Sequence, residues 1–320
     1  MNKKRNIDFY NVPIVDYLLS IGEPLEAVGR NYYQHKDHDS LKINVNRNYF
    51  VWNSRTGEKN ARGGVVQYLQ IMYNMTLAEA LSKVESDLSG KELKPVKKKE
   101  KAYPKVFNYK VSEVFVPIEA QRYLVAERKI PNSIVRHFFS IDLISQNENE
   151  EIIFKWRKGN EVVGFTKQGT KRLTDEQKER YKTERDYFKY VAPTTKEHTY
   201  WGFNYLVGQP KNLYFFEAPI DLLSYYTLHE KKLLDQGDFW LISIDGVAIE
   251  KVFSFIGYGI KYLQLKDCLE TLNICFDNDS AGKNALKNLK VYEIDGIPFH
   301  DHTPKYAEDW NEVLKIKGVI

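Results

Sequence analysis

Two short apolar runs stand out in the last third of the chain. Residues 212–216 are Asn-Leu-Tyr-Phe-Phe, and residues 271–276 are Thr-Leu-Asn-Ile-Cys-Phe. Each run is rich in residues that favour strands, ends at an acidic residue and continues into a pattern compatible with a helix. A further apolar run, residues 239–244, lies between them. The pattern predicts buried parallel strands that each lead into a helix, which is an α/β arrangement.

The first part of the chain predicts helices around a hairpin. Residues 7–31 suit one helix, a break and a second short segment. Residues 41–52 alternate apolar and polar side chains on both sides of Arg47, which predicts a hairpin. Residues 65–81 have apolar positions at helical spacing with a break at Asn74, and this predicts two amphipathic helices.

The middle of the chain also mixes the two kinds of element. Apolar residues at helical spacing predict a helix over 119–128 and a second one through Phe138. Residues 152–166 predict two strands joined by a turn at Gly159. The densely charged residues 171–189 predict a helix or a loop. We therefore expect an α+β chain overall, with an α/β sheet in its last third.

Acidic residues directly follow the two apolar runs. Glu217 follows the first run, and Asp277 and Asp279 follow the second. Because loops beyond the carboxyl ends of parallel strands line the ligand crevice of open α/β sheets, these three residues are expected to converge. Mg²⁺ prefers a few carboxylate oxygens, retained waters and a substrate phosphate. The pattern predicts a site for Mg²⁺ or Mn²⁺ that serves nucleotidyl transfer or phosphodiester chemistry.

Helix capping is the alternative explanation of these acids. Asp279 and Ser280 stand where an N-cap would favour the following helix. Capping and metal binding are compatible for one residue. Three acids that all end apolar strands exceed what capping needs, so we favour the metal site.

Composition narrows the class of protein. The 320 residues are 42% hydrophobic and 14% aromatic, which is typical of a globular chain with two or three domains. The net charge of +4 is too small to argue by itself for nucleic acid. The only two cysteines, Cys268 and Cys275, fit a reducing cytoplasm. No apolar run approaches the roughly 18–20 residues that span a bilayer, so we expect a cytoplasmic protein without a membrane partner.

Charge and proline content also predict the domain boundaries. Residues 89–105 are rich in lysine and proline and contain hardly an apolar residue, which predicts a solvated linker. The linker would separate an N-terminal module, residues 1–88, from a basic subdomain, residues 106–205. A catalytic subdomain would follow over residues 206–320.

The order of Glu217, Asp277 and Asp279 along the chain resembles the pattern of acidic residues in a known family. A lone glutamate after one strand, Asp-x-Asp at 277–279 after a later strand and Ala-Gly at 281–282 resemble the Toprim domain, which bacterial primases, topoisomerases and some nucleases share. Residues 305–312, Lys-Tyr-Ala-Glu-Asp-Trp-Asn-Glu, resemble the acidic segment that follows in DnaG-type primases. The resemblance implies a Rossmann-like parallel sheet and a nucleotidyltransferase of the primase type.

The resemblance also implies roles for individual residues. Two metal ions would be held by Glu217, Asp277 and Asp279, with Asp221 and Asp309 in support. Lys305 is a candidate phosphate contact. Lys283 lies at the start of the predicted helix, whose N-terminus favours a phosphate.

The N-terminal module resembles the zinc ribbon of the same primases, but its metal ligands are missing. His35 and the Gly63-Gly64 turn are in place, whereas no cysteine occurs before position 268. A structural zinc site needs four ligands, and His35 and His38 alone cannot supply them. We therefore predict a ribbon-like module without zinc, held by aromatic packing that includes Tyr32, Tyr33, Tyr49, Phe50 and Trp52. These aromatics either stack on single-stranded template or only fill a small core.

Six basic residues cluster around the predicted hairpin at 152–166. In the resembled primases this region lines the groove for template and nascent strand, so the six are candidates for nucleic-acid binding. Gln168 departs from the family's arginine, and a polar solvent face is an equally good explanation. The six residues are Lys155, Arg157, Lys158, Lys167, Lys171 and Arg172.

These observations favour a compact primase that makes short RNA primers on single-stranded DNA from nucleoside triphosphates. A replicative helicase or a replication initiator is a candidate partner, and the compact design suggests a mobile element such as a plasmid. Two alternatives stay open. One is a Toprim phosphodiesterase that cuts nucleic acid, and the other is an inactive relative that binds single strands.

Overall fold

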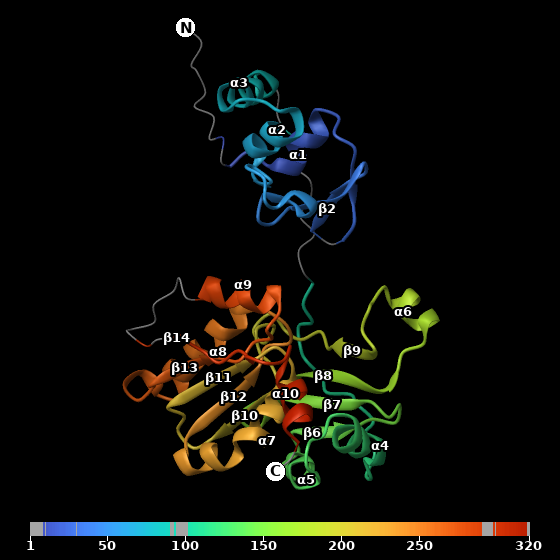
Figure 1. Ribbon diagram of the computed structural model, residues 1–320, viewed down its shortest axis with the longest axis vertical. Coiled ribbons are helices and arrows are strands. Elements are labelled where there is room, and N and C mark those ends of the chain that lie inside the picture. The colour runs from blue at the N-terminus through green and yellow to red at the C-terminus, as the bar shows by residue number, and fades with distance from the viewer. Residues whose placement is uncertain are drawn as a thin grey trace. The chain divides into compact units, whose positions relative to one another are not determined.

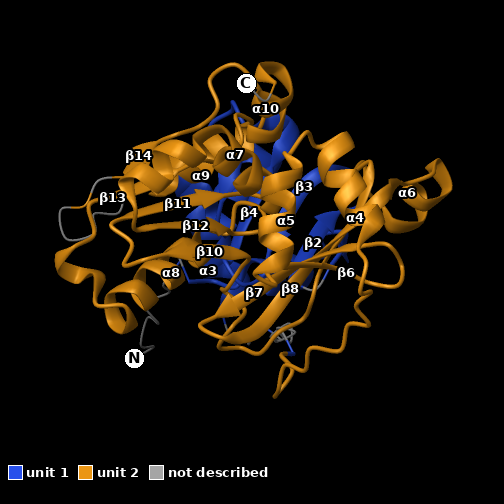
Figure 2. Ribbon diagram, turned by 90° about the horizontal axis from the view of Figure 1, so that it is seen from below, with its two compact units in different colours: residues 1–102 blue, residues 103–320 orange. Residues whose placement is uncertain are grey.

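The computed structural model describes residues 11–29, 31–89, 102–289 and 299–318, together with positions 9, 93 and 297. By their internal contacts, residues 1–102 and residues 103–320 form two compact units (Figure 2). Each unit has a hydrophobic core of its own. Most of the segment 89–105, for which the sequence predicts a linker, lies outside the described residues.

Within its described residues, the first unit contains a five-stranded antiparallel sheet and three α-helices. Its strands, in both chain and sheet order, are β1 (Leu25–Ala27), β2 (Tyr32–His35), β3 (His38–Asn44), β4 (Tyr49–Trp52) and β5 (Arg62–Gly63). Its helices are α1 (Ile14–Ser20), α2 (Val65–Tyr73) and α3 (Leu77–Leu88), with a 3₁₀ turn η1 (Asn53–Arg55). The predicted hairpin is confirmed, since β3 and β4 pair. Asn74 separates α2 from α3 in the left-handed conformation, as the break in the pattern predicts.

A buried carboxylate organises the surroundings of His35 in this unit. His35 is buried, and its Nε2 lies 3.2 Å from Oε2 of Glu23. The Tyr68 hydroxyl donates to the same carboxylate oxygen at 2.7 Å. The His38 ring lies 4.8 Å from the rings of both His35 and Trp52. Hydrogen bonds and ring contacts within the protein therefore hold His35 in place.

Aromatic packing holds this core, although through fewer residues than expected. Phe50 and Trp52 are buried, Tyr33 packs against the core, and the rings of Phe50 and Tyr68 meet edge to face at 5.4 Å. The expectation is wrong for Tyr32, which is 48% exposed. Successive side chains of a strand point to opposite faces, so Tyr33 turns inward and Tyr32 outward.

We expect Glu23→Ala to lower the free energy of unfolding of the first unit by about 2–3 kcal/mol, because it leaves the buried Tyr68 hydroxyl without its acceptor. Hydrogen exchange read by mass spectrometry should show lost protection in β2 to β4. Glu26→Ala, an exposed change in β1, is the matched control and should leave the protection unchanged. Equal effects of the two changes would show that the carboxylate has no structural role.

The second unit combines an antiparallel sheet with a mostly parallel one (Figure 1). The antiparallel sheet has the order β6 (Ile144–Gln146), β7 (Ile152–Lys158), β8 (Glu161–Arg172) and β9 (Tyr187–Val191). Its helical segments are α4 (Ile118–Arg122), which continues as the π-helical turn η2 (Tyr123–Glu127), α5 (Asn132–Ser140) and α6 (Asp175–Tyr181). The predicted hairpin is confirmed as β7 and β8, and the charged segment 171–189 forms α6 between the ends of β8 and β9.

The parallel sheet has the order β10-β12-β11-β13-β14, in which only β10 runs antiparallel to its neighbour. Its strands are β10 (Asn204–Val207), β11 (Asn212–Phe216), β12 (Phe239–Ser243), β13 (Thr271–Ile274) and β14 (Phe299–Asp301). The helical segments are α7 (Pro219–Gln236), α8 (Ile249–Tyr262), the 3₁₀ turn η3 (Leu265–Asp267), α9 (Ser280–Leu289) and α10 (Trp310–Lys317). The predicted α/β sheet within an α+β chain is confirmed. No helix among the described residues has both the length and the apolar character of a membrane span.

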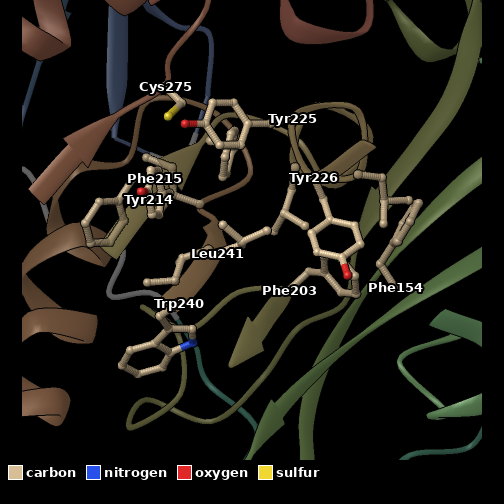
Figure 3. Close-up of a cluster of buried hydrophobic side chains, with 14 of the residues drawn as sticks. Phe154, Phe203, Tyr214, Phe215, Tyr225, Tyr226, Trp240, Leu241 and Cys275 are labelled. Atoms are coloured by element: carbon tan, nitrogen blue, oxygen red, sulfur yellow. The ribbon is translucent and has the colours of Figure 1, made fainter. Parts of the chain in front are cut away.

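A single hydrophobic core joins the two sheets of the second unit. In Figure 3, Tyr226 lies next to Phe154 from β7 and Phe203, while Tyr225 turns toward Cys275 beyond β13. The rings of Phe154 and Phe203 meet at 5.2 Å. The segments expected as a basic subdomain and a catalytic subdomain therefore share their core, which fixes the antiparallel sheet against the parallel one.

Candidate active site

The acids that follow the apolar runs lie at the same edge of the parallel sheet. Strand β11 pairs in parallel with β12 and with β13, so the three strands end on one side. Glu217 directly follows β11, and Asp277 comes three residues after the end of β13. Helix α7 starts with Pro219 at its first position, a residue pre-organised for a helix start, and carries Asp221 in its first turn.

The structure brings Glu217 and Asp277 into contact. Oε1 of Glu217 accepts a hydrogen bond from the backbone N–H of Asp277 at 3.2 Å. Gly282 permits this approach, because a Cβ at that position would lie 2.2 Å from the carbonyl oxygen of Asp277 and 2.9 Å from Oε1 of Glu217. The Ala-Gly pair of the motif therefore lets helix α9 pack against both acids.

Burial and, to a smaller extent, mutual repulsion raise the pKa values of three of these acids. Burial raises the pKa of Asp277 to about 9, with further contributions from the charges of Asp221, Glu217, Asp309 and Asp279. Burial and the charge of Asp309 raise the pKa of Asp221 to about 7. The pKa of Glu217 is raised by burial and by Asp279. Like charges at short range favour protonation, so a bound cation would stabilise the ionised cluster.

Two of the five acids also cap helices. Oδ1 of Asp279 accepts from the backbone N–H of Gly282 at 2.7 Å, and Oδ1 of Asp309 accepts from that of Glu312 at 2.7 Å. The capping alternative is therefore confirmed for Asp279, and Asp309 does the same for α10. A cap occupies one carboxylate oxygen, which leaves the other oxygen of each residue for a cation.

Asp221 is held by a buried amide at the start of α10. It accepts a hydrogen bond from the backbone N–H of Asn311 at 3.2 Å. The Asn311 side chain donates to the carbonyl of Arg128 at 2.8 Å and to the hydroxyl of Ser224 at 2.9 Å. Asn311 therefore ties α10 to α7 and to the turn after η2, and this positions Asp221 and Asp309.

The residues present fit a hard divalent cation. Oδ1 of Asp277 is buried and has no hydrogen-bond partner within the part of the chain that the structure describes. Every candidate ligand is a carboxylate oxygen, the donor type that Mg²⁺ and Mn²⁺ prefer. Across the described ranges, no group of three or more His, Cys, Asp or Glu side chains is arranged so that it could hold a metal ion as it stands. Binding would therefore require the carboxylates to lose their protons and draw together.

Sequence reasoning missed two residues at this edge. Asp245 directly follows the apolar run 239–244, which contains β12. The Nζ of Lys189, on β9, lies 3.7 Å from Oδ1 of Asp245. The charge of Lys189 also lowers the pKa of Glu217 and of Asp221, against the larger effect of burial, so Lys189 faces the cluster. Asp245, like Glu217, is an acidic residue that directly follows an apolar run, so the same sequence pattern could have identified it. No pattern marks Lys189, because the pairing of β8 with β9 decides where it points.

Asp245 also links the two sheets. The Thr166 hydroxyl on β8 donates to Oδ1 of Asp245 at 3.0 Å and accepts from the indole N–H of Trp156 at 3.1 Å. Lys251 lies 3.5 Å from Oδ2 of Asp245 and 4.4 Å from the Trp156 ring centroid. This buried network holds β8 and β9, and with them Lys189, against the acidic edge.

Acidic partners neutralise all six basic residues around the hairpin. Lys155 is buried between Glu113 and Asp142, which removes its charge from any surface that a strand could reach. The remaining five are partly or fully accessible. They stay candidates for binding a nucleic-acid strand, whose phosphates would replace their carboxylate partners. Their ion pairs are Arg157–Asp142, Lys158–Glu197, Lys167–Glu151, Lys171–Glu150 and Arg172–Asp186.

The two lysines predicted to contact phosphates are both exposed. The Lys283 ammonium donates to the carbonyl of Asn278 at 3.2 Å, so it lies across the loop that carries Asp277 and Asp279. Lys305 lines a surface pocket beside α10. The structure therefore places Lys283 next to the acids and Lys305 in a different feature of the surface.

Comparison with known families and proteins agrees with this fold. Residues 214–314 match the family described as Toprim-like, and residues 122–187 match a family described as a protein of unknown function. The Toprim-like segment contains all five acids. Residues 214–314 are thus a Toprim-like domain, and the resemblance of this segment seen in the sequence is confirmed.

Two curated relatives are similar in sequence. An uncharacterized protein of Bacillus anthracis, pXO2-78, is 29% identical over 98% of this chain and 92% of its own length. The uncharacterized protein MG010 of Mycoplasma genitalium is 28% identical over 43% of this chain and 57% of its own length. The first similarity extends across both compact units.

Solved structures with similarity include two primase fragments. The primase fragment of the bacteriophage T7 primase-helicase protein is 16% identical, with a TM-score of 0.40, and the match covers 71% of this chain and 80% of the fragment. The Aquifex aeolicus primase, with zinc-binding and RNA polymerase domains, is 13% identical, with a TM-score of 0.34, and the match covers 99% of this chain and 83% of that structure.

Proposed function

We propose that the chain is a primase-like nucleotidyltransferase that joins ribonucleotides on a single-stranded DNA template. The observation that carries the proposal is the gathering of five acids at one edge of a Toprim-like sheet, where burial and like charge hold the pKa of Asp277 near 9. A cluster built at this electrostatic cost is typical of a catalytic site.

Carboxylates from two neighbouring strands would hold the metal. Glu217 and Asp277 are the central ligands, and Asp279 and Asp309 would each offer the oxygen that its helix cap leaves free. Asp221 lies deeper and is held by Asn311, so it supports the cluster. Mg²⁺ or Mn²⁺, when bound, would neutralise triphosphate charge and favour ionisation of the attacking hydroxyl.

Two lysines near the acids would hold phosphates. Lys189 faces the acids from β9, and Lys283 spans the loop between Asp277 and α9. Their ammonium groups would bind the triphosphate of the incoming nucleotide and stabilise the pyrophosphate that leaves. The primer's 3′ hydroxyl attacks the α-phosphate, so one phosphodiester bond forms as the α–β anhydride breaks.

The proposed template path runs along the antiparallel sheet. The accessible residues Arg157, Lys158, Lys167, Lys171 and Arg172 follow β7 and β8, and the buried network at Asp245 fixes these strands against the acids. When single-stranded DNA binds, its phosphates would replace the carboxylate partners of these residues. The exchange would cost little, because exposed ion pairs are weak. The position in the cell that suits this function is the cytoplasm.

A product assay tests the proposal. The protein is incubated with single-stranded DNA, labelled ribonucleotides and Mg²⁺ or Mn²⁺, beside Glu217→Gln and the control Glu270→Gln, an exposed acid that precedes β13. Labelled oligoribonucleotides should form, and Glu217→Gln should lower their rate by at least about 10²-fold while the control stays unchanged. Shortened DNA would indicate a phosphodiesterase instead, and bound strand without any product would indicate a binding protein.

A further inference from the structure

A surface pocket of about 610 Å³ lies between α7, α10 and the segment that follows β14. None of the five acids of the candidate active site lines it. Pockets of 300–1,000 Å³ are typical of sites for small organic ligands. The size therefore suits one small molecule, and the lining residues show which chemistry it would have.

Aromatic rings form one wall of this pocket. Tyr225 and His229 stack at 4.2 Å with an interplanar angle of 16°. Trp310 stands edge-on to both rings, at 4.8 Å from Tyr225 and 5.6 Å from His229. Val313 lines the pocket from the same helix as Trp310. A wall of this kind suits a flat aromatic ligand, since every nucleobase presents a π-face.

Polar groups in the wall offer one donor and one acceptor. The indole Nε1–H of Trp310 is buried and has no hydrogen-bond partner among the described residues. Burial and the charge of Lys232 lower the pKa of His229, which favours the neutral ring. Its Nδ1 contacts the carbonyl of Tyr225 at 3.0 Å and must donate there, which leaves Nε2 as an acceptor. A nucleobase edge carries the complementary groups.

Lysines surround the pocket and give it a positive field. Lys232, Lys305 and Lys317 line it, and within the described ranges no ion pair engages any of them. Asp301 is the one carboxylate among the lining residues. Ammonium groups bind phosphates as point charges, so the excess of lysines over carboxylates among the lining residues favours a phosphorylated ligand.

We propose that this pocket binds a nucleotide, with the base against Trp310 and Tyr225 and the phosphates on Lys232, Lys305 and Lys317. The site is distinct from the acidic edge and goes beyond the proposed catalytic function. It reassigns Lys305 from the reacting triphosphate to a second nucleotide. An aromatic base that carries phosphate is available as a free nucleotide or as the 5′-phosphorylated end of a strand.

Calorimetric titration with ADP in the presence of EDTA tests this site. Without a divalent cation the acidic cluster lacks the ion that would join its carboxylates to phosphates, and the variants below assign the remaining binding to the pocket. Lys232→Gln and Trp310→Phe should each weaken ADP binding by about tenfold, because one removes a phosphate contact and the other removes the indole N–H together with part of the stacking surface. Lys231→Gln, an exposed change on the same helix, and Asp277→Asn are the controls and should bind like the wild type.

Several results would overturn the proposal. They are the absence of ADP binding in EDTA, equal affinity in Lys232→Gln and Lys231→Gln, and loss of binding in Asp277→Asn. If pyrophosphate bound as tightly as ADP, the base would contribute nothing to the affinity, and the proposed contact with the aromatic wall would be wrong. A 5′-phosphorylated trinucleotide that binds about tenfold more tightly than ADP would support the pocket and assign it to a strand end. Since none of these titrations requires catalysis, they separate this site from the proposed primase activity.

Discussion

Asp277→Asn is expected to lower the rate of primer synthesis by at least about 10³-fold and, without metal, to raise stability at pH 8 by about 2 kcal/mol. The asparagine would remove a central ligand of the proposed metal site, and it also removes a carboxylate that burial and four neighbouring acids make costly to ionise. Primer synthesis and calorimetric unfolding in EDTA measure the two effects. Opposite changes in activity and stability identify a site built for function.

The pH dependence of stability follows from the same carboxyl. The folded protein binds a proton at Asp277 up to a pKa of about 9, whereas the unfolded chain releases it near 3.8. Between these values the folded state carries the extra proton, so metal-free stability falls as pH rises, by roughly 1.4 kcal/mol per pH unit from this group. Below the window both states are protonated, and above it both are ionised.

Metal should reverse this trend. Mg²⁺ or Mn²⁺ displaces the proton, so the stabilisation it confers on the wild type should grow between pH 6 and pH 9. Asp277→Asn should lose the metal effect and most of the slope above pH 7, where Asp221 has largely titrated, and Asp267→Asn, an exposed change in η3, should retain them. A wild-type stability that is flat with pH, or equal metal effects in both variants, would contradict the acidic cluster as a metal site.

Gly282→Ala is expected to lower primer synthesis by about 10²-fold and the free energy of unfolding by about 1–3 kcal/mol. The added Cβ would lie 2.2 Å from the carbonyl oxygen of Asp277, so the first turn of α9 must move away from the acids. That movement displaces Glu217 and the cap at Asp279. The rate of primer synthesis and urea unfolding measure the two effects.

Gly257→Ala provides the matched control for this prediction. Gly257 lies within α8, and a Cβ there would meet no atom within 4 Å. The change should stabilise the protein by about 0.5–1 kcal/mol, because alanine favours a helix interior over glycine, and should leave primer synthesis unchanged. Wild-type activity in Gly282→Ala would show that close packing of α9 is unnecessary for the site.

Local pattern predicted much of this fold. The apolar runs that end at Glu217 and Asp277 are strands β11 and β13, and the hairpins and the helix break at Asn74 lie where alternation and spacing predict them. Such features depend on residues that are only a few positions apart along the chain, so they can be predicted from a single sequence. The convergence of strand ends also follows from the rule for parallel sheets.

The basic residues show where local pattern is insufficient. Lys155 and Lys167 are two positive charges on neighbouring strands, yet the first is buried between two carboxylates and the second is partly exposed beside one. Lys189, from a segment expected only to be a charged helix or loop, faces the acids. Which charge meets which depends on the pairing of β8 with β9 and on the core that both sheets share.

The sequence by itself determined the two hairpins, the three central strands of the parallel sheet and the identity of the five acids, because those depend on side-chain type and short-range order. Only the tertiary structure decided the protonation of Asp277, the pairing of the hairpin lysines and the positions of Lys189 and the nucleotide pocket. Burial and Coulomb forces act through space, so they depend on which distant segments pack together and not on their separation along the chain.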